Sequence, residues 1–515
     1  MEREISTSSK LATPANSGHH CTETSNKPVD LEKCQNGSVE TGNETTVSDA
    51  NIVTWDSPDD PENPLDWPTW LRWTLISLVS AMTFMAGLSS SMFAPSVPSL
   101  LVEFNSTNTT IGSLVVTIFV LGLATGPLFF APLSELYGRT YVQHVGCVGF
   151  LVFTVGCALS TSLNMLIGMR LLQGTFAAVP LTNGGGIIAD MVRQEERGFA
   201  MGVFTTGTLI GPIVGPIAGA LLSSVKSWRW IFYVIAMALG IMTCLCGLLW
   251  RESYAPVLLA RKAARLRKET GNQDLRTRYD QGLSSRDYFL RGIVRPIKML
   301  IFSPILAALC LHMGLAYAYF YILFTTFTDI FTEIYHWEFK IIGLSFIGVG
   351  CGFFFGQLLF TKLSDSILKR LANKGDGEMM PEYRLPLGCI GGIFVPLGLF
   401  WYGWSVEAQV HWIVPILGTA VIGLGNAMIF ISIQAYTIDA WTLFAASGLA
   451  ANTVVRSVMA ALIPLAAPKL YAALGLGWGN SLLAFLALAM VPVPVLLFFY
   501  GERMRGWNSV RMSTL

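Results

Sequence analysis

The sequence predicts an all-α integral membrane protein with twelve transmembrane helices arranged as two six-helix pseudo-repeats. Three observations lead to this prediction: the composition, the number and length of the apolar runs, and a similarity between the two halves of the chain. Of the 515 residues, 52% are hydrophobic and only 13% are charged. Such a chain has too few charges to cover the surface of a soluble globular protein.

Twelve apolar runs have about the length that is needed to cross a bilayer. They cover residues 71–93, 111–132, 141–160, 165–189, 198–222, 228–250, 300–327, 339–361, 385–404, 411–437, 443–470 and 478–500. A charged segment separates the first six runs from the last six. We therefore expect a first bundle over residues 66–250, a cytosolic central loop over 251–298 and a second bundle over 299–502.

The two ends of the chain differ from these bundles in composition. Residues 1–65 are polar and lack the apolar core of a cleavable signal peptide, so we expect a disordered cytosolic tail. Residues 503–515 are expected to form a second, short cytosolic tail.

The placement of Lys and Arg predicts the orientation. These residues gather in the central segment and in the loop after the eighth run. Four loops of the other face contain none, and they cover residues 94–110, 161–164, 328–338 and 405–410. The positive-inside rule then places both termini in the cytosol. On the outer face, Asn105 and Asn108 begin Asn-X-Ser/Thr sequons, which predicts glycosylation there.

Charge and chemically reactive residues exclude several classes of protein. The formal net charge of +1 indicates no acidic partner such as a nucleic acid. Nine cysteines show no metal or disulfide spacing, and six scattered histidines provide no cluster of catalytic groups or metal ligands. We therefore expect no enzyme, no metal site and no cofactor.

The loops after the second and the eighth runs are similar to each other. The first reads LSELYGR from Leu133 to Arg139, and the second reads LSDSILKR from Leu363 to Arg370. A further similarity places Asp190 at the end of the fourth run and Asp439 at the end of the tenth. Parallel duplicated halves with a site between them are typical of rocking transporters. The repeat therefore favours transport over a receptor or a membrane enzyme.

Four motifs link the chain to a known family. Besides LSELYGR, they are Arg170-Leu-Leu-Gln173-Gly174 in the fourth run, the glycine-rich segment Gly207–Gly219 in the fifth, and LAANTVVRS from Leu449 to Ser457. On these motifs the chain resembles the major facilitator superfamily, and within it the fungal twelve-span drug:proton antiporters, from about residue 63 to residue 505. The resemblance implies the major facilitator fold, a place in the plasma membrane, and efflux driven by the proton gradient.

The LSELYGR loop is the first candidate for a conformational switch. Glu135 and Arg139 flank Gly138 in a tight cytosolic turn, where they can pair with each other or with neighbouring helix ends. An exposed ion pair is worth about 1 kcal/mol, and a rocking equilibrium needs differences of that order. The second loop offers Asp365 but lacks the Gly-Arg pair, which predicts a weaker latch. The alternative is an ordinary solvated loop.

A glycine ladder in the fifth run is the second candidate. Glycine at every fourth position lets two helix backbones approach closely, and proline removes an intrahelical hydrogen bond and so predicts a bend. The ladder consists of Gly207, Gly211, Gly215 and Gly219, with Pro212 and Pro216 between them. We expect it to form a flexible seal between spans that acts in gating. Simple helix packing is the alternative.

Four ionisable residues are the candidates for coupling. Arg170 and Arg456 lie inside apolar runs, where each should face a cavity or a polar partner, because a charge at the bilayer centre costs about 2.5–3.5 kcal/mol. Asp190 lies at the cytosolic mouth, and His312 lies midway along the seventh run. The alternatives are structural: hydrogen bonds to backbone carbonyls, an ion pair with a nearby arginine, and packing. No Asp or Glu lies in the core of a run, so carboxylates at the two mouths are the other proton candidates.

Aromatic and amide side chains from several runs predict the substrate site. They are Gln173, Tyr317, Tyr321, Gln357, Asn426, Gln434 and Asn452. Large aromatic faces with few fixed charges suit bulky, amphipathic compounds that are neutral or weakly cationic. Aromatic residues that face lipid or a neighbouring helix are the alternative.

We therefore expect a monomeric secondary transporter that exports a hydrophobic drug, toxin or secondary metabolite by alternating access in exchange for protons. Its partners are the small-molecule substrate and the lipid bilayer. A polyamine, organic-acid or nutrient carrier of the same fold is the first alternative. A transporter-like membrane sensor is the second.

Overall fold

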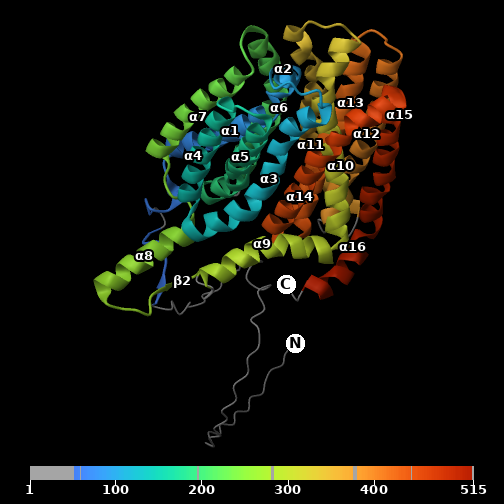
Figure 1. Cartoon of the computed structure of the whole chain (residues 1–515). Coiled ribbons are helices and arrows are strands. Elements are labelled where there is room, and N and C mark those ends of the chain that lie inside the picture. Colours follow the sequence, from blue (N-terminus) through green and yellow to red (C-terminus); the bar gives the residue numbers. More distant parts are fainter. Residues whose placement is uncertain are drawn as a thin grey trace, which may run out of the picture. The chain divides into compact units, whose positions relative to one another are not determined.

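A computed structural model gives the fold of the chain (Figure 1). It describes residues 51–57, 60–193, 196–279, 284–374, 380–441 and 444–512, which belong to one compact unit. The side chains that lie outside this description are those of Arg197, Gly198, Leu209, Asp365, Lys374 and residues 505–512. The predicted switch side chain of Asp365 and the tail before residue 51 are therefore outside the described part of the protein.

Six long apolar helices form the first half of the unit. They are α1 (Thr69–Ser91), α3 (Thr109–Tyr137), α4 (Arg139–Ala158), α5 (Leu163–Met191), α6 (Arg197–Val225) and α7 (Arg229–Leu249). The short turn η3 (Ala94–Ser96) and helix α2 (Val97–Glu103) lead from α1 to α3. Each long helix contains the core of its predicted run.

Among its described residues, the second half contains seven helices, and short turns precede three of them. The helices are α10 (Pro304–Glu333), α11 (Ile347–Lys374), α12 (Pro386–Glu407), α13 (Ile413–Ala440), α14 (Ala445–Leu462), α15 (Ala467–Met490) and α16 (Pro492–Met512). The turns η4 (Phe339–Phe346), η5 (Pro381–Arg384) and η7 (Ile463–Ala466) precede α11, α12 and α15.

The last two predicted spans lie in one continuous helical stretch. Among the described residues, eleven stretches are long and apolar enough to cross a membrane, and the last one, Ala445–Met504, has 60 residues. It changes direction at Gly475, whose φ of 73° lies in the left-handed region that favours glycine. The Glu407 carboxylate accepts hydrogen bonds from the backbone N–H groups of Leu476 and Gly477 at 3.0 and 3.1 Å, which caps the second limb. This stretch therefore supplies two spans, and the fold has twelve.

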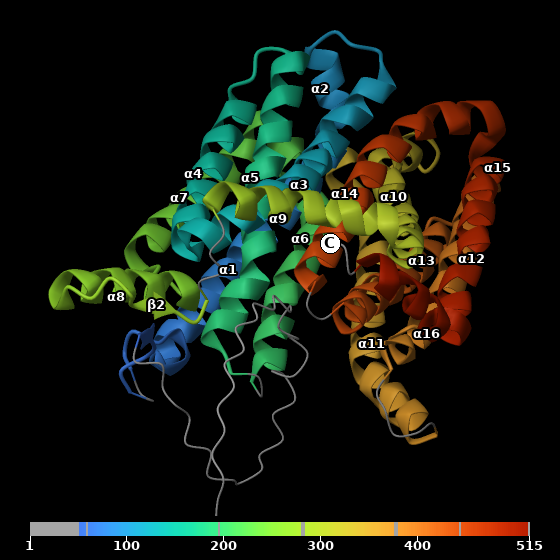
Figure 2. The ribbon, with the colours of Figure 1, turned by 90° about the horizontal axis from the view of Figure 1, so that it is seen from below.

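The same helix pairs pack in both halves. In the first half, α1 packs on α6, α3 on α5, and α4 on both α5 and α7. In the second half, α10 packs on α14, α11 on α13, and α12 on both α13 and α15. Each pair of the second half is a pair of the first half moved on by six spans, so the two bundles are pseudo-repeats. Figure 2 shows them as two groups, coloured blue to green and yellow to red.

The two halves meet along two crossings that follow the same symmetry. Helix α3 packs on α14, and α6 packs on η4 and the start of α11. The second crossing is tight, because a Cβ atom added at Gly343 would lie 2.6 Å from the Cα atom of Ile217. We call the end of the unit that holds α2 the α2 face, and the opposite end, which holds α9 (Ser285–Phe302), the α9 face.

Two helices make up most of the central segment between the halves. Helix α8 (Ala255–Thr270) extends away from the bundle, and α9 lies across the ends of both halves, where it contacts α3, α10, α14 and α16 (Figure 1). A Cβ atom at Gly292 of α9 would overlap the Pro132 ring of α3. The Arg295 guanidinium lies 3.9 Å from the centre of the Phe444 ring. Helix α9 is therefore fixed to both halves.

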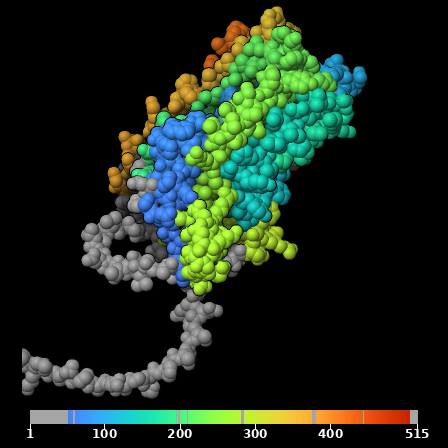
Figure 3. All heavy atoms as spheres, turned by 90° about the vertical axis from the view of Figure 1, so that its left-hand side faces the viewer, coloured from blue at the N-terminus to red at the C-terminus, as the bar shows by residue number. Residues whose placement is uncertain are grey.

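The chain before α1 is bound to α8. Strand β1 (Ile52–Val53) pairs in parallel with β2 (Arg276–Thr277). Lys262 of α8 is buried and pairs with Asp56 at 2.7 Å and with Asp60 at 3.5 Å. Figure 3 shows the blue residues at the start of the unit beside the yellow-green atoms of α8. The last part of the predicted disordered tail is thus ordered, because its acidic side chains pair with basic residues of the central segment.

The glycine ladder of α6 faces α1 within the first half. A Cβ atom added at Gly207 or Gly211 would lie 2.6 Å from a carbonyl oxygen of α1, and one added at Gly215 or Gly219 would overlap α1. The contact therefore joins two helices of the same bundle, as the packing alternative predicts. The role in gating stays a prediction.

The two prolines of α6 do not interrupt it. Helix α6 is continuous through Pro212 and Pro216. The Pro216 carbonyl oxygen would lie 2.9 Å from a Cβ atom at Gly343, so this side of α6 meets the second half. One face of α6 thus holds its own bundle together, and another face touches the opposite bundle.

We predict that Gly219→Ala destabilises the protein, whereas Gly202→Ala in the same helix does not. The methyl group at position 219 would overlap the backbone of α1, and such overpacking costs about 1–3 kcal/mol. Nothing lies within 4 Å of a Cβ atom at Gly202, where alanine stabilises the helix by roughly 0.5–1 kcal/mol. Thermal melting of the purified protein in detergent measures both changes. Equal melting temperatures for the two variants would contradict the close packing of α1 on α6.

Candidate functional site

A cavity lies where the two halves meet. The volume of this cavity is about 70 Å³. Four helices of each half contribute to it, namely α1, α3, α5, α6, α10, α11, α13 and α14. Its lining consists of Ala86, Gly87, Ser90, Leu123, Leu181, Thr208, Pro212, Ile213, Tyr317, Phe320, Tyr321, Phe353, Phe430 and Arg456. The cavity thus occupies the place that a carrier built from two repeats uses for its substrate.

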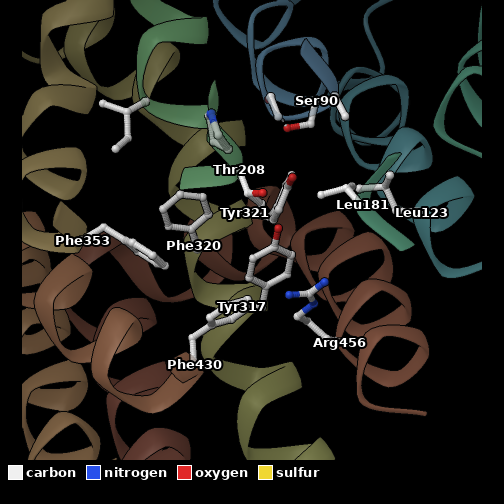
Figure 4. A pocket seen from close by; sticks show the side chains of 14 residues that line it. Ser90, Leu123, Leu181, Thr208, Tyr317, Phe320, Tyr321, Phe353, Phe430 and Arg456 are labelled. Atoms are coloured by element: carbon white, nitrogen blue, oxygen red, sulfur yellow. Dashed lines mark hydrogen bonds between the residues drawn. The ribbon is translucent and has the colours of Figure 1, made fainter. Parts of the chain in front are cut away.

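Aromatic side chains of the second half form one wall of the cavity (Figure 4). Tyr317, Phe320 and Tyr321 of α10 share a face of the helix, because residues three and four positions apart are neighbours on its surface. The Tyr317 ring centre lies 5.3 Å from that of Tyr321, and the Phe320 ring centre lies 6.0 Å from that of Phe353. Phe430 of α13 completes this wall at 6.4 Å from Phe353. The wall offers flat apolar faces to a ligand.

Polar atoms gather in the middle of the cavity. In Figure 4 the hydroxyl groups of Ser90, Thr208, Tyr317 and Tyr321 point into the same space. The first two come from the first half and the tyrosines come from the second. A bound molecule can therefore exchange hydrogen bonds with both halves at once.

Arg456 of α14 is the one charged residue among the fourteen that line the cavity. Its guanidinium lies 4.7 Å from the centre of the Tyr317 ring and 5.1 Å from that of Phe430. Its Nε atom is buried, and no hydrogen-bond partner for it lies among the described residues. The expectation that Arg456 faces a cavity is met.

Arg170 has different surroundings. It is fully buried inside the first half, where it donates hydrogen bonds to the carbonyl oxygens of Val115 at 3.3 Å and Ser89 at 2.9 Å. It also donates to the Gln173 side chain at 3.1 Å, and Gln173 in turn donates to Thr154 at 2.8 Å. Neither Arg170 nor Gln173 lines the cavity. These contacts match the structural alternative for Arg170, and they place Gln173 away from a substrate in the cavity.

The other predicted substrate residues divide into two groups. Tyr317 and Tyr321 line the cavity, and Asn426 lines a smaller adjoining space that shares Tyr317 with it. The structure places three residues outside both linings: Gln357, Gln434 and Asn452. Phe320, Phe353 and Phe430 were not predicted, although the spacing of Phe320 from Tyr317 indicates that it shares the same helix face.

His312 lies within the second half and does not line the cavity. The Cε1 atom of its ring would lie 4.0 Å from a Cβ atom at Gly392 of α12. No hydrogen-bond partner for either ring nitrogen is found in the described part of the chain. This placement agrees with packing between α10 and α12, and the predicted part of His312 in coupling stays untested.

An ion pair joins the LSELYGR loop to the end of α5. The Arg139 guanidinium lies 3.4 Å from the Asp190 carboxylate, and it donates a hydrogen bond to the Ser134 hydroxyl at 2.6 Å. Both charged side chains are largely buried, with exposures of 11% and 18%. Arg139 thus pairs with Asp190, which fits the expectation that this loop contacts a neighbouring helix end. The two residues are far apart in the chain but meet at the α9 face.

The second half contains the same arrangement. Arg384 lies 3.0 Å from Asp439 and donates a hydrogen bond to Ser364 at 3.2 Å. Asp439 ends α13 as Asp190 ends α5, and Arg384 immediately precedes α12 as Arg139 begins α4. The second half thus has a basic residue in the place that Arg139 takes in the first half, and a weaker latch there stays a prediction. Lys369 and Arg370, the basic residues of the second loop motif, are both exposed on α11.

Gly138 and Glu135 hold the first loop in place. Gly138 has a φ of 101°, and a Cβ atom there would overlap the Glu252 carboxylate. This carboxylate accepts hydrogen bonds from the backbone N–H groups of Arg139 at 2.9 Å and Thr140 at 3.2 Å. Glu135 has a different partner from Arg139. Its carboxylate accepts a hydrogen bond from the Tyr288 hydroxyl of α9 at 2.7 Å. Burial and the nearby Glu135 charge raise the pKa of Tyr288, which keeps this donor protonated.

The two predicted glycosylation sites are exposed near the α2 face. Asn105 has a left-handed backbone with a φ of 51°. Asn108 caps α3, because its side-chain oxygen accepts hydrogen bonds from the N–H groups of Thr110 and Ile111 at 3.0 and 3.4 Å. Glycosylation of either site stays a prediction.

The family of the chain follows from a comparison with known proteins. A family model of the Major Facilitator Superfamily matches residues 79–464. The chain belongs to the major facilitator superfamily. The repeated six-helix bundles and the cavity between them are the features of a transporter of this superfamily, which binds a small-molecule substrate within a membrane.

Similar sequences come from fungi. The chain is 49% identical to the MFS-type transporter penM of Penicillium rubens, in a match that covers 93% of this chain and 92% of the relative. It is 47% identical to the efflux pump radE of Floropilus chiversii, with coverage of 89% and 85%. The relatives are named as transporters and efflux pumps, and the chain is accordingly a transporter and not an enzyme.

Solved structures of the superfamily share the fold. A D-xylose-proton symporter has a TM-score of 0.61 at 15% sequence identity, in a match that covers 83% of this chain and 99% of that one. A partially occluded inward-open form of the xylose transporter XylE from E. coli has a TM-score of 0.60 at 15% identity, with coverage of 84% and 98%. These similarities establish the architecture alone.

We predict that Arg384 and Asp439 stabilise the protein as a pair. Arg384→Ala and Asp439→Ala should each lower the melting temperature. The melting temperature of the double variant should be no lower than that of the less stable single variant. A half-exposed ion pair of this kind is worth about 0.5–1 kcal/mol. Thermal melting in detergent gives the double-mutant cycle, and Lys369→Ala on exposed α11 is the control without an effect. Additive losses would show that the two residues act independently.

Proposed function

We propose that the protein exports a hydrophobic small molecule across the plasma membrane in exchange for protons, by alternating access. The observation that carries this proposal is the cavity between the pseudo-repeats, which joins an aromatic wall to a few hydroxyl groups and one arginine. Apolar walls with a small number of polar groups are typical of sites for drug-sized organic molecules. The name of the Floropilus chiversii relative, an efflux pump, supports export as the direction.

A polyamine carrier is disfavoured by the charge of the cavity. A polyamine needs carboxylates to balance its several positive charges, and the described lining contains none. A transporter-like sensor has no specific observation in its favour. Export of an apolar compound therefore remains the function that the geometry supports best.

The cavity has to widen during transport. The present space of about 70 Å³ holds a few water molecules, whereas pockets for drug-sized ligands measure roughly 300–1,000 Å³. Contacts between α6 and η4 close the side toward the α2 face. We propose that rocking of the halves opens the two sides in turn, with the ion pairs Arg139–Asp190 and Arg384–Asp439 stabilising one of the two states.

The orientation and the coupling ion belong to the same proposal. The positive-inside rule places the α9 face in the cytosol, together with both termini, and it leaves Asn105 and Asn108 outside for glycosylation. Protonation of Asp190 or Asp439 would remove the charge that holds its arginine, which would link proton binding to release of the latch. His312 and Arg456 are the other candidates for coupling, and a monomer has all the elements that this scheme needs.

Transport into membrane vesicles tests the proposal. We expect inside-out vesicles with an acidic interior to accumulate hydrophobic compounds from a test panel, and we expect a protonophore to abolish the accumulation. Asp190→Asn should lower gradient-driven uptake several-fold, because the ion pair biases an equilibrium by about 1 kcal/mol. Gly202→Ala, a substitution at an open position of α6, is the matched control and should transport normally. Accumulation that ignores the pH gradient would contradict proton exchange.

A further inference from the structure

We propose that the cavity selects planar, hydrophobic organic acids and binds them as anions, with Arg456 as the residue that holds the negative charge. This inference rests on the proposed function, because it names the class of compound that the same cavity would carry. It also changes one expectation from the sequence, which favoured neutral or weakly cationic compounds.

The first observation is that the charge of Arg456 has no acidic partner in the described part of the protein. Its guanidinium contacts the faces of the Tyr317 and Phe430 rings, at 4.7 and 5.1 Å from their centres, and its buried Nε atom has no hydrogen-bond partner there. A charged group in the membrane interior normally pairs with an opposite charge or with carbonyl oxygens. Arg456 has only the weaker attraction of aromatic faces.

Arg170 shows what a structural arginine looks like in the same protein. It donates to the carbonyl oxygens of Ser89 and Val115 and to the Gln173 side chain, and no part of it reaches the cavity. Both arginines lie in apolar helices beside aromatic rings, and each has one buried nitrogen without a partner among the described residues, but only Arg456 lines the space between the halves. The difference indicates that the partner of Arg456 is a molecule that enters this space.

The Nε–H group of Arg456 has no acceptor among the described residues. The N–H groups of a guanidinium point outward along the edge of its plane, in a fork that fits a carboxylate. A carboxylate or an ionised phenol can accept hydrogen bonds from this edge, and a planar carboxylate can accept two. The charge-assisted bonds would replace the missing partner of the buried Nε atom.

The rest of the cavity suits a flat acidic molecule. The rings of Phe320 and Phe353 offer faces for stacking, and the Tyr321 hydroxyl is a further polar group of the lining (Figure 4). The Ser90 and Thr208 hydroxyls donate to the carbonyl oxygens of Gly87 and Phe204. A cationic ligand would meet the like charge of Arg456 without any carboxylate in the described lining to offset it. A neutral ligand would stack equally well but would leave the guanidinium without an anionic partner.

Binding of three matched probes tests the proposal on the full-length protein in lipid nanodiscs. The probes are 1-naphthaleneacetate, the neutral 1-naphthaleneacetamide and the cationic 2-(1-naphthyl)ethylammonium, which share a two-ring system and differ mainly in charge. We expect the anion to bind about tenfold more tightly than the amide, the difference that one charge-assisted hydrogen bond supplies. We expect the cation to bind more weakly than both. Titration calorimetry gives the three affinities.

Substitutions test whether Arg456 causes the preference for the anionic probe. Arg456→Gln should reduce binding of the anion to the level of the amide, and Arg456→Lys should keep a preference for the anion. Arg503→Gln, at an exposed position of α16 away from the cavity, is the matched control and should leave all three affinities unchanged. An anion preference that survives Arg456→Gln would overturn the assignment.

The comparison on the native protein needs no variant, so a variant that fails to fold does not remove the test. Equal affinities for the three probes, or no binding of any, would overturn the proposal. Proton-driven export of neutral compounds without a preference for acids would overturn the selectivity and keep the proposed function. Tight binding of the anion without proton-driven transport would keep the selectivity and overturn the proposed function.

Discussion

Contact between helix backbones at glycine holds each half of this transporter together. Gly174 of α5 lies against the Phe119 carbonyl group of α3, and Gly352 of α11 lies against the Ala420 carbonyl group of α13, where even a methyl group would overlap. Apolar side chains gain little by leaving lipid for another apolar surface, so close packing has to supply the association. Two bodies packed in this way keep their shape. The helices of each half then move largely as one body, and the largest displacement falls at the interface between the halves, where the cavity lies.

The helices could be predicted from the sequence, but several details of the site could not. Apolar runs of membrane length give a strong signal, and it located all twelve spans. Tyr317 and Tyr321 could be predicted as cavity residues because they share a face of one helix. Phe353 and Phe430 could not, since they reach the cavity only through the packing of α11 and α13 on their neighbours. Packing between helices leaves no recurring pattern in the amino-acid sequence.

The two arginine pairs show a second limit of sequence comparison. Arg139 lies five residues after Ser134, whereas Arg384 lies twenty residues after Ser364, although each donates to the corresponding serine. The longer loop moves the equivalent residue out of the aligned segment. The position of Arg384 directly before the ninth span was the available signal. Position relative to the spans is therefore a better guide to equivalent residues than distance from a motif.

Helix α9 sets a mechanical condition on any change in the cavity. It contacts α3 through Gly292 and lies beside Phe444 of the second half through Arg295. A single stiff helix that is fixed to two bodies cannot follow both when they part, so one of its contacts has to slide or break. The work of opening thus depends on a segment that does not line the cavity. The rate of transport and the choice of substrate are therefore separable in this protein. Substitutions in α9 can change the rate without altering the cavity residues that select the substrate.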